Sequence, residues 1–238
     1  MKTTRRLLRT LVPATVAVAA LATYAAPSFA ADTATPDPGQ FTTTIDNPYL
    51  PFKPGTVMRY RESGNGQGTD VVRVTRRTKV IQGVTCVVVR DRAFMNGKLV
   101  EDTRDWYAQD SKGNVWYFGE DTKEYKNGKV TSTAGTWMAG RDGARAGIIM
   151  QAHPRVGQTY HQEYAAGVAE DQATVLSRTE TAKVPYGSFN QVLKTKDFTA
   201  LEPKKVEEKY YARGVGSVLE TLVKGGHERL VLVSVEHR

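Results

Sequence analysis

Hydrophobic and polar residues alternate along most of the chain after Gly55, in short runs that glycine- and asparagine-containing turns separate. Near the C-terminus, Val231, Val233 and Val235 fall on one face of a predicted strand and Glu236 on the other, because successive side chains of a strand point to opposite faces. No segment carries the 3.6-residue period of an amphipathic helix of about a dozen residues. About eleven such runs predict an all-β fold, a single domain of antiparallel strands in a curved meander that forms a half-barrel or barrel.

Three glycine-containing pairs predict tight hairpins between these runs. Asn96-Gly97 and Asn127-Gly128 suit two-residue type I′ turns, in which both residues have positive φ. Gly225-Gly226 predicts a third hairpin of the same kind, between strands at 217–224 and 227–237.

Residues 139–154 interrupt the series of strands. The segment combines several glycines and a proline with the apolar patch Ile148-Ile149-Met150. Loops of this length in a compact domain usually act as a lid or plug. We therefore expect one long excursion loop that crosses the sheet or covers the mouth of the barrel.

The first 30 residues have the pattern of a secretory signal peptide. Four basic residues precede a short apolar run, 11–22, and small residues at 28 and 30 precede a predicted cleavage site. The apolar run is too short for a membrane-spanning helix, so we predict a secreted, extracellular protein that is not integral to the membrane. Arg5-Arg6 leaves both general secretory and twin-arginine export open.

The predicted organisation after the signal peptide, 1–30, has two parts. Residues 31–45 begin with a stretch rich in Thr, Pro, Asp and Ala that has no apolar period, which predicts a flexible leader. Residues 46–238 form the single β domain, and we expect it to be a monomer.

Charge argues against a nucleic-acid partner. The chain has 33 Lys and Arg against 25 Asp and Glu, a formal net charge of +8. Four of the basic residues and none of the acids belong to the signal peptide, so residues 31–238 retain 29 against 25, or +4. This mixture lacks the concentrated basic surface of a nucleic-acid-binding protein.

The only cysteine, Cys86, cannot form a disulfide within the chain. It lies in the apolar run Val84-Thr85-Cys86-Val87-Val88-Val89. We predict a buried, unreactive thiol in a strand, because nothing nearby in the sequence would stabilise a thiolate.

A polar row follows one face of the predicted strand before residue 110. Glu101, Asp105, Tyr107 and Gln109 share this face, whereas Trp106 projects to the other. Aromatic residues on strands usually pack in the core, but walls of mixed aromatic and polar side chains are typical of small-molecule sites. The row is therefore a candidate lining for a ligand cavity.

A second candidate is the short run at 160–164, which places His161 and Glu163 on one face. Together with Asp105, Tyr107 and Glu170, these side chains could act as acid–base catalysts. One His–carboxylate pair is too few for a typical metal site, so we predict no metal.

Sequence motifs give no further sign of catalysis or of a cofactor. The chain has no Gly-x-Ser-x-Gly elbow, phosphate-binding glycine loop, His-Glu-x-x-His or Cys-x-x-Cys motif. This favours a non-catalytic protein without a cofactor.

Two motifs resemble a widespread group of bacterial secreted proteins: DWYAQD with GNVWYFGED at 105–110 and 113–121, and KYYARGVG at 209–216. The resemblance covers the chain from about Asn47 onward and carries no catalytic residues across. The C-terminal motif also resembles exported half-barrel proteins similar to lipoprotein carriers. That second likeness implies a curved sheet with a hydrophobic or amphiphilic ligand in its concavity.

The leading hypothesis is an exported, non-catalytic protein that binds a small or amphiphilic ligand, a lipid or a cell-envelope component in the concavity of the sheet. Its candidate ligand-binding residues are Glu101, Asp105, Tyr107, Gln109, Ile148, Ile149 and Met150. A secreted hydrolase or lyase acting on an extracellular polymer, and a structural or protein-interaction module, remain alternatives. An enzyme requires convergent acid–base groups in an open cleft, a carrier an apolar cavity with few titratable groups, and an interaction module a flat surface.

Overall fold

The computed structural model describes residues 37–64 and 66–238, and the predicted signal peptide, 1–30, lies outside them. The described chain consists of sixteen strands and one short 3-10 helix, η1 (Pro38–Gln40). No helix in these ranges is long and apolar enough to cross a membrane. The strands are β1 (Phe41–Thr42), β2 (Thr56–Ser63), β3 (Gly68–Ile81), β4 (Val84–Met95), β5 (Lys98–Asp110), β6 (Val115–Lys126), β7 (Lys129–Ser132), β8 (Trp137–Met138), β9 (Arg145–Met150), β10 (Thr159–His161), β11 (Glu163–Tyr164), β12 (Asp171–Val184), β13 (Gly187–Thr199), β14 (Val206–Ala212), β15 (Gly216–Lys224) and β16 (Arg229–His237).

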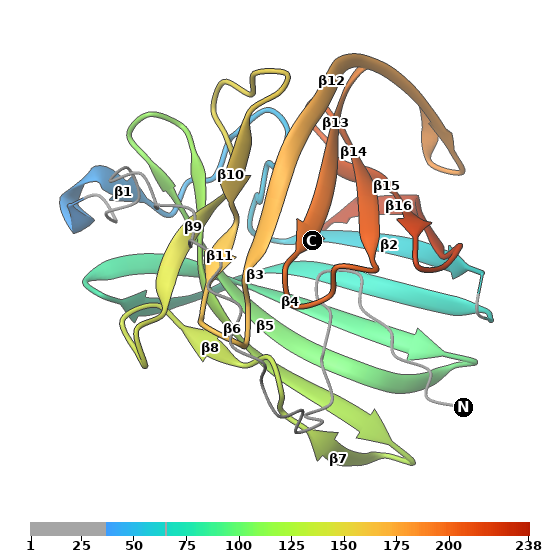
Figure 1. Ribbon diagram of the computed structural model, residues 1–238, viewed down its shortest axis with the longest axis horizontal. Coiled ribbons are helices and arrows are strands. Elements are labelled where there is room, and N and C mark those ends of the chain that lie inside the picture. The colour runs from blue at the N-terminus through green and yellow to red at the C-terminus, as the bar shows by residue number, and fades with distance from the viewer. Residues whose placement is uncertain (1–36, 65) are drawn as a thin grey trace, which may run out of the picture.

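All strand pairs are antiparallel, and the main path of the sheet runs β10-β12-β13-β14-β15-β16-β2-β3-β4-β5-β6-β9-β11. In Figure 1, β12 to β14 run at a steep angle to β3 to β6. The all-β prediction is confirmed, but the count of eleven strands is wrong. The additional strands include β8, β10 and β11, which have two or three residues each and are too short to show alternation.

The sheet bends into a nearly closed barrel because two consecutive short strands pair with its opposite ends. β10 pairs with β12 and β11 pairs with β9, and only Gln162 separates β10 from β11. At this junction the backbones of β9 and the 159–164 segment touch. A Cβ on Gly147 would lie 2.5 Å from the carbonyl carbon of Gln162, so only glycine fits there without a shift.

The turns follow the sequence signals in two of three cases. Asn96-Gly97 and Asn127-Gly128 have positive φ at both residues and join their strands as two-residue hairpins, as predicted. The third prediction is wrong, because residues 225–228 form a four-residue connection in which Gly225 alone has positive φ. His227 therefore lies in the connection and not in β16.

Part of the expected excursion loop at 139–154 is incorporated into the sheet. Arg145–Met150 forms β9, which pairs with β6 on one side and with β11 on the other. The glycines that suggested a long loop are divided between the tight connection at 139–144 and the close backbone contact at Gly147. The barrel wall therefore contains 145–150, the apolar part of the segment that we expected to lie over its mouth.

The fold also begins before the boundary expected at residue 46. β1 pairs with β5, and the Phe41 ring packs edge-on against Trp116 and Phe118, with centroids 6.0 and 5.4 Å apart. Ile45 is buried as well. The second part of the predicted leader thus covers the outer face of β5 and β6.

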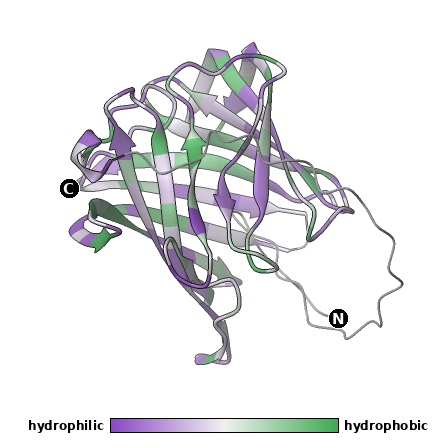
Figure 2. Ribbon diagram, turned by 60° about the vertical axis from the view of Figure 1, so that its left-hand side comes forward, coloured by the Kyte–Doolittle hydropathy of each residue, from purple (hydrophilic) through white to green (hydrophobic). Residues whose placement is uncertain are grey.

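Apolar and polar residues alternate along the long strands (Figure 2). Trp106 and Tyr107 point to opposite faces of the sheet. The Lys79 ammonium lies 3.7 Å from the centre of the Trp106 ring. Cys86 is fully buried as predicted, and burial raises the pKa of its thiol to about 12.

The Gly147 contact predicts a position-specific cost of adding one methyl group. We expect Gly147→Ala to lower the free energy of unfolding by about 1–3 kcal/mol, because the new Cβ forces β9 away from Gln162. Gly187→Ala is the matched control, since its Cβ would meet only the Phe189 ring at 3.5 Å. Urea denaturation compares the two variants, and equal losses of stability would contradict close backbone contact at the junction.

Candidate functional site

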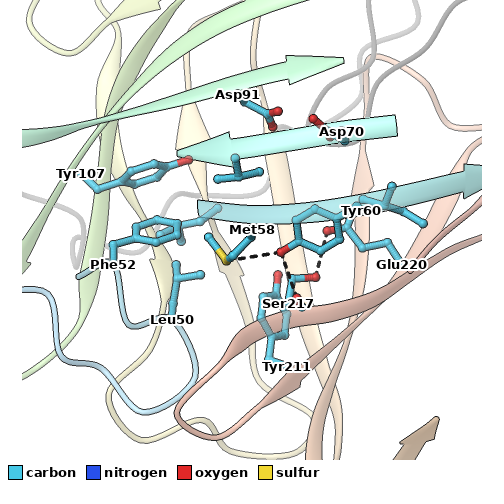
Figure 3. Close-up of a pocket in the computed structure, with 13 residues that line it drawn as sticks. Leu50, Phe52, Met58, Tyr60, Asp70, Asp91, Tyr107, Tyr211, Ser217 and Glu220 are labelled. Atoms are coloured by element: carbon cyan, nitrogen blue, oxygen red, sulfur yellow. Dashed lines mark hydrogen bonds between the residues drawn. The ribbon is translucent and has the colours of Figure 1, made fainter. Parts of the chain in front are cut away.

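A cavity of about 60 Å³ lies inside the barrel, between β2–β5 on one side and β14–β16 on the other (Figure 3). Such a volume has room for roughly four to six water molecules or one small organic group. Carboxyl groups, aromatic rings and aliphatic side chains share its wall. The lining residues are Leu50, Phe52, Met58, Tyr60, Asp70, Val72, Asp91, Tyr107, Ile149, Tyr211, Ser217, Glu220 and Leu230.

Strand register places several of these side chains next to one another. Tyr60 of β2 pairs with Asp70 of β3, and two residues along the strand Met58 pairs with Val72. Val72 in turn pairs with Asp91 of β4. Because residues two apart on a strand face the same side, all five side chains point into the barrel.

The carboxyl groups of Asp70 and Asp91 lie next to each other in Figure 3. A side-chain hydrogen bond between them lowers the pKa of Asp70 and raises that of Asp91. Burial raises the pKa of Asp70 to about 6, while a hydrogen bond from Asp91 opposes the shift. Burial and the adjacent Asp70 charge raise the pKa of Asp91 well above its ordinary value. The pair therefore holds a proton near neutral pH, and the Oδ1 atom of each residue has no hydrogen-bond partner.

Glu220 of β15 supplies a third carboxyl group. Ser217 Oγ donates to Glu220 Oε1 at 3.0 Å, and Tyr60 donates its hydroxyl to the Ser217 carbonyl at 3.0 Å. Glu220 is buried, with 8% of its surface exposed, yet its Oε2 atom has no hydrogen-bond partner. Burial raises the pKa of Glu220 to about 8, against the opposing effect of Lys209.

A second buried polar cluster lies beside the cavity. The Tyr117 hydroxyl is 2.6 Å from Asp105 Oδ1 and 2.7 Å from Glu120 Oε2. The Tyr107 ring stacks on Tyr117 with centroids 4.8 Å apart and contacts Phe52 at 5.0 Å on the cavity side. Tyr107 thus separates the Asp105–Glu120 cluster from the cavity.

The only basic residue among the buried side chains of the described chain is Lys209. Its ammonium lies 3.2 Å from Asp197 Oδ2 and 3.9 Å from Glu207 Oε2. Burial alone would lower the pKa of Lys209, but Asp197 and the other surrounding acids raise it well above its ordinary value. Lys209 therefore stays charged and bound to Asp197.

The structure separates the residues that we predicted to bind a ligand. Tyr107 and Ile149 line the cavity, and Asp105 lies behind Tyr107 in the neighbouring cluster. Gln109 instead accepts from the backbone N–H groups of Asp46 and Asn47 and so anchors the chain before β2. Glu101 accepts from Thr103, Met150 packs in the core and Ile148 is half-buried, and none of the three lines this cavity.

The acid–base residues of the enzyme alternative do not share the cavity, except for Tyr107. Glu163 is buried and accepts from the Trp137 indole at 3.1 Å. His161 is half-buried on β10, and burial lowers the pKa of its imidazole. Glu170 accepts from the Gly167 N–H in a surface turn. Within the described ranges no group of three or more His, Cys, Asp or Glu residues is arranged to hold a metal ion.

Sequence reasoning missed the three cavity carboxyls, although their strands contained a signal. Asp70 shares a strand face with Val72 and Val74, Asp91 with Val89, and Glu220 with Val218. Our search looked for several polar residues on one strand face, so it missed single acidic residues on faces that are otherwise apolar. We expected a carrier to have an apolar cavity with few titratable groups. This expectation needs correction, because three carboxyl groups line the cavity.

The raised pKa values predict that these carboxyls make the protein less stable as the pH rises. Below the pKa of the unfolded chain, each carboxyl is protonated in both the folded and the unfolded protein. Above that pKa the carboxyl ionises in the unfolded protein first, so the free energy of unfolding falls until the pH passes the pKa of the folded protein. For Glu220 the window extends from about 4.5 to about 8. We expect Glu220→Gln to flatten the decline between pH 6 and 8 by on the order of 1 kcal/mol per pH unit.

Urea denaturation at pH 6, 7 and 8 measures this slope for the wild type and two variants. Glu236→Gln is the control, because arginine contacts lower the pKa of Glu236 and keep its titration below this range. His161 is present in all three proteins, so its contribution to the pH dependence of stability cancels in the comparison. Identical slopes for the wild type and Glu220→Gln would contradict a protonated Glu220.

No family model matches the chain, and no curated protein matches it. Two solved structures are similar in fold. One is a putative exported protein with a YmcC-like fold from Bacteroides fragilis, with 15% identity and a TM-score of 0.47. The other is a putative lipoprotein from Parabacteroides distasonis, with 11% identity and a TM-score of 0.43. Each alignment covers 79% of this chain and 98% of the other, and at these values the likeness assigns this chain to no family.

Proposed function

We propose that this chain is an exported, non-catalytic binding protein that holds a small or amphiphilic ligand inside its barrel. The observation that carries the proposal is the cavity itself, whose lining includes three carboxyl groups that each have a buried oxygen without a protein partner. A buried polar atom without a partner costs about 1–3 kcal/mol. A site that keeps several such atoms beside open space is suited to a molecule that supplies the missing hydrogen bonds.

The wall of the cavity also has an apolar part. Leu50, Phe52, Met58 and Leu230 line it together with the carboxyl groups. Sites for small molecules combine a mainly apolar lining with a few polar groups that fix orientation. This lining supports a ligand with one polar end and a short apolar part, such as a small amphiphile or the end group of a larger envelope component.

Export is supported by the predicted signal peptide at 1–30. The sequence resemblance to secreted bacterial proteins supports the same location. The protein would then meet its ligand outside the cell or within the cell envelope.

The contacts of the acid–base candidates argue against catalysis by these particular residues. Asp105 contacts Tyr117, Glu163 contacts Trp137, and Glu170 lies in a surface turn. A hydrolase or lyase built on these residues would need at least two of them at one reacting atom. Their different partners are more consistent with structural roles.

Methionine methyl NMR tests the proposal with internal controls. Met58 lines the cavity, whereas Met95 and Met138 do not. We expect at least one member of the series n-butylamine, n-butanol and butyrate to shift the Met58 methyl resonance saturably, with smaller shifts at Met95 and Met138. These probes are matched to the cavity in size, since each has five or six non-hydrogen atoms.

Two variants on β16 provide the matched comparison. Leu230→Phe fills the cavity and should abolish the Met58 shift, whereas Val233→Phe, at a position that is 38% exposed, should retain it. Circular dichroism confirms that both variants fold. No saturable Met58 shift with any of the three probes would contradict a binding function for this cavity.

A further inference from the structure

We propose that the ligand is a small organic cation, a primary alkylammonium, which the barrel binds through its carboxyl groups and aromatic rings; this inference rests on the proposed function. Three features of the interior support it independently: the sign of the buried charges, the number and type of unpartnered atoms, and the aromatic lining.

The buried charged residues are strongly unbalanced. Of those in the described chain, nine are acids and one, Lys209, is basic. Asp197 holds Lys209 at 3.2 Å, and two more of the buried acids, Asp102 and Asp110, have partners of their own in Arg90 and Trp116. The cavity carboxyls have no basic residue among their lining neighbours. The interior is therefore acidic although the chain has a positive net charge.

The unpartnered atoms of the cavity are all carboxyl oxygens, which in the ionised form only accept hydrogen bonds. Asp70 Oδ1, Asp91 Oδ1 and Glu220 Oε2 each lack a hydrogen-bond partner, and Asp70 is only 2% exposed. A primary ammonium has three N–H donors and no acceptor, so it complements such a set. A carboxylate or phosphate ligand would instead place its own negative charge among these acids, with a large energetic cost.

The rest of the lining suits the remainder of such a ligand. Phe52, Tyr60, Tyr107 and Tyr211 contribute aromatic rings, whose faces attract cations. Leu50 and Met58 lie together in Figure 3, below the carboxyl pair, and provide an apolar surface for an alkyl chain.

Binding of an ammonium should release a proton. Near pH 7 the carboxyl group of Glu220, whose pKa is about 8, carries a proton, and Asp70 and Asp91 share another. A cation favours the ionised carboxyls, so the ammonium enters with its N–H groups intact and a carboxyl proton passes to the buffer. The charged groups around the site are Lys209, Glu207 and Asp197 near Glu220, Glu101 near Asp70, and Glu120 near Asp91.

Isothermal titration calorimetry at pH 7 tests this with n-butylamine, n-butanol and butyrate. We expect n-butylamine to bind about ten-fold or more tightly than n-butanol, because charge-assisted hydrogen bonds are the stronger ones, and butyrate to bind most weakly. The observed enthalpy should depend on the ionisation enthalpy of the buffer, corresponding to roughly one proton released per amine. Amine affinity should rise from pH 6 to pH 8.

Two isosteric substitutions separate the cavity from the surface. Asp70→Asn removes a cavity carboxyl and should weaken n-butylamine by about ten-fold while changing n-butanol by about two-fold or less. Asp121→Asn removes the same charge from the outer ion pair with Arg104 and should leave both affinities unchanged. Thermal melting confirms that both variants fold.

The outcomes distinguish this inference from the proposed function. If n-butanol or butyrate shifts Met58 and binds as tightly as n-butylamine, the barrel binds ligands but the assignment to cations is wrong. If none of the probes binds, both proposals fail. Equal amine affinity in the wild type and Asp70→Asn would also overturn the cation site.

The ammonium group could belong to a free amine or to a lipid headgroup. Vesicles that contain phosphatidylethanolamine, compared with vesicles of phosphatidylglycerol, separate these sources. A Met58 shift with n-butylamine alone indicates a free amine, whereas an additional shift that is specific to phosphatidylethanolamine indicates a headgroup.

Discussion

The burial of many carboxyl groups around very few cations is the constraint that shapes this molecule. Removal of a carboxylate from water is costly unless it is paired, hydrogen-bonded or protonated. The barrel uses all three solutions: Asp197 pairs with Lys209, Asp105 contacts the Tyr117 hydroxyl, and burial raises the pKa of Glu220 to about 8. The Asp70–Asp91 pair combines protonation with a hydrogen bond.

This polar interior can exist because the sheet closes around it. β10 and β11 connect the two ends of the strand path across Gln162, and Gly147 allows the backbones to touch there. Gln162 itself donates to Asp197, so the closing segment is bonded to the acidic interior. The barrel thus buries the carboxyls, and this burial raises their pKa values.

The fold was more predictable from the sequence than the site. Asn96-Gly97 and Asn127-Gly128 encode their turns locally, because few residues other than these adopt positive φ twice in succession. The closing strands β10 and β11 have only three and two residues, too few to show alternation, so their pairing with β12 and β9 could not be predicted from the pattern. The cavity likewise assembles carboxyls from β3, β4 and β15, and Tyr107 was the one polar candidate whose strand face placed it there. Gln109 shares that strand face, but its side-chain oxygen accepts hydrogen bonds from the backbone N–H groups of Asp46 and Asn47.

The protonation state of the cavity carboxyls tests this account most directly. Carbon-13 NMR of the side-chain carboxyl groups, followed from pH 4 to pH 9 in the ligand-free protein, reports each group separately. The account predicts that Glu220 titrates near pH 8 and Asp70 near pH 6, and that saturating n-butylamine lowers both midpoints. An ordinary midpoint near 4.5 for Glu220 in the ligand-free protein would contradict it, because the carboxyl would then be fully compensated without a ligand.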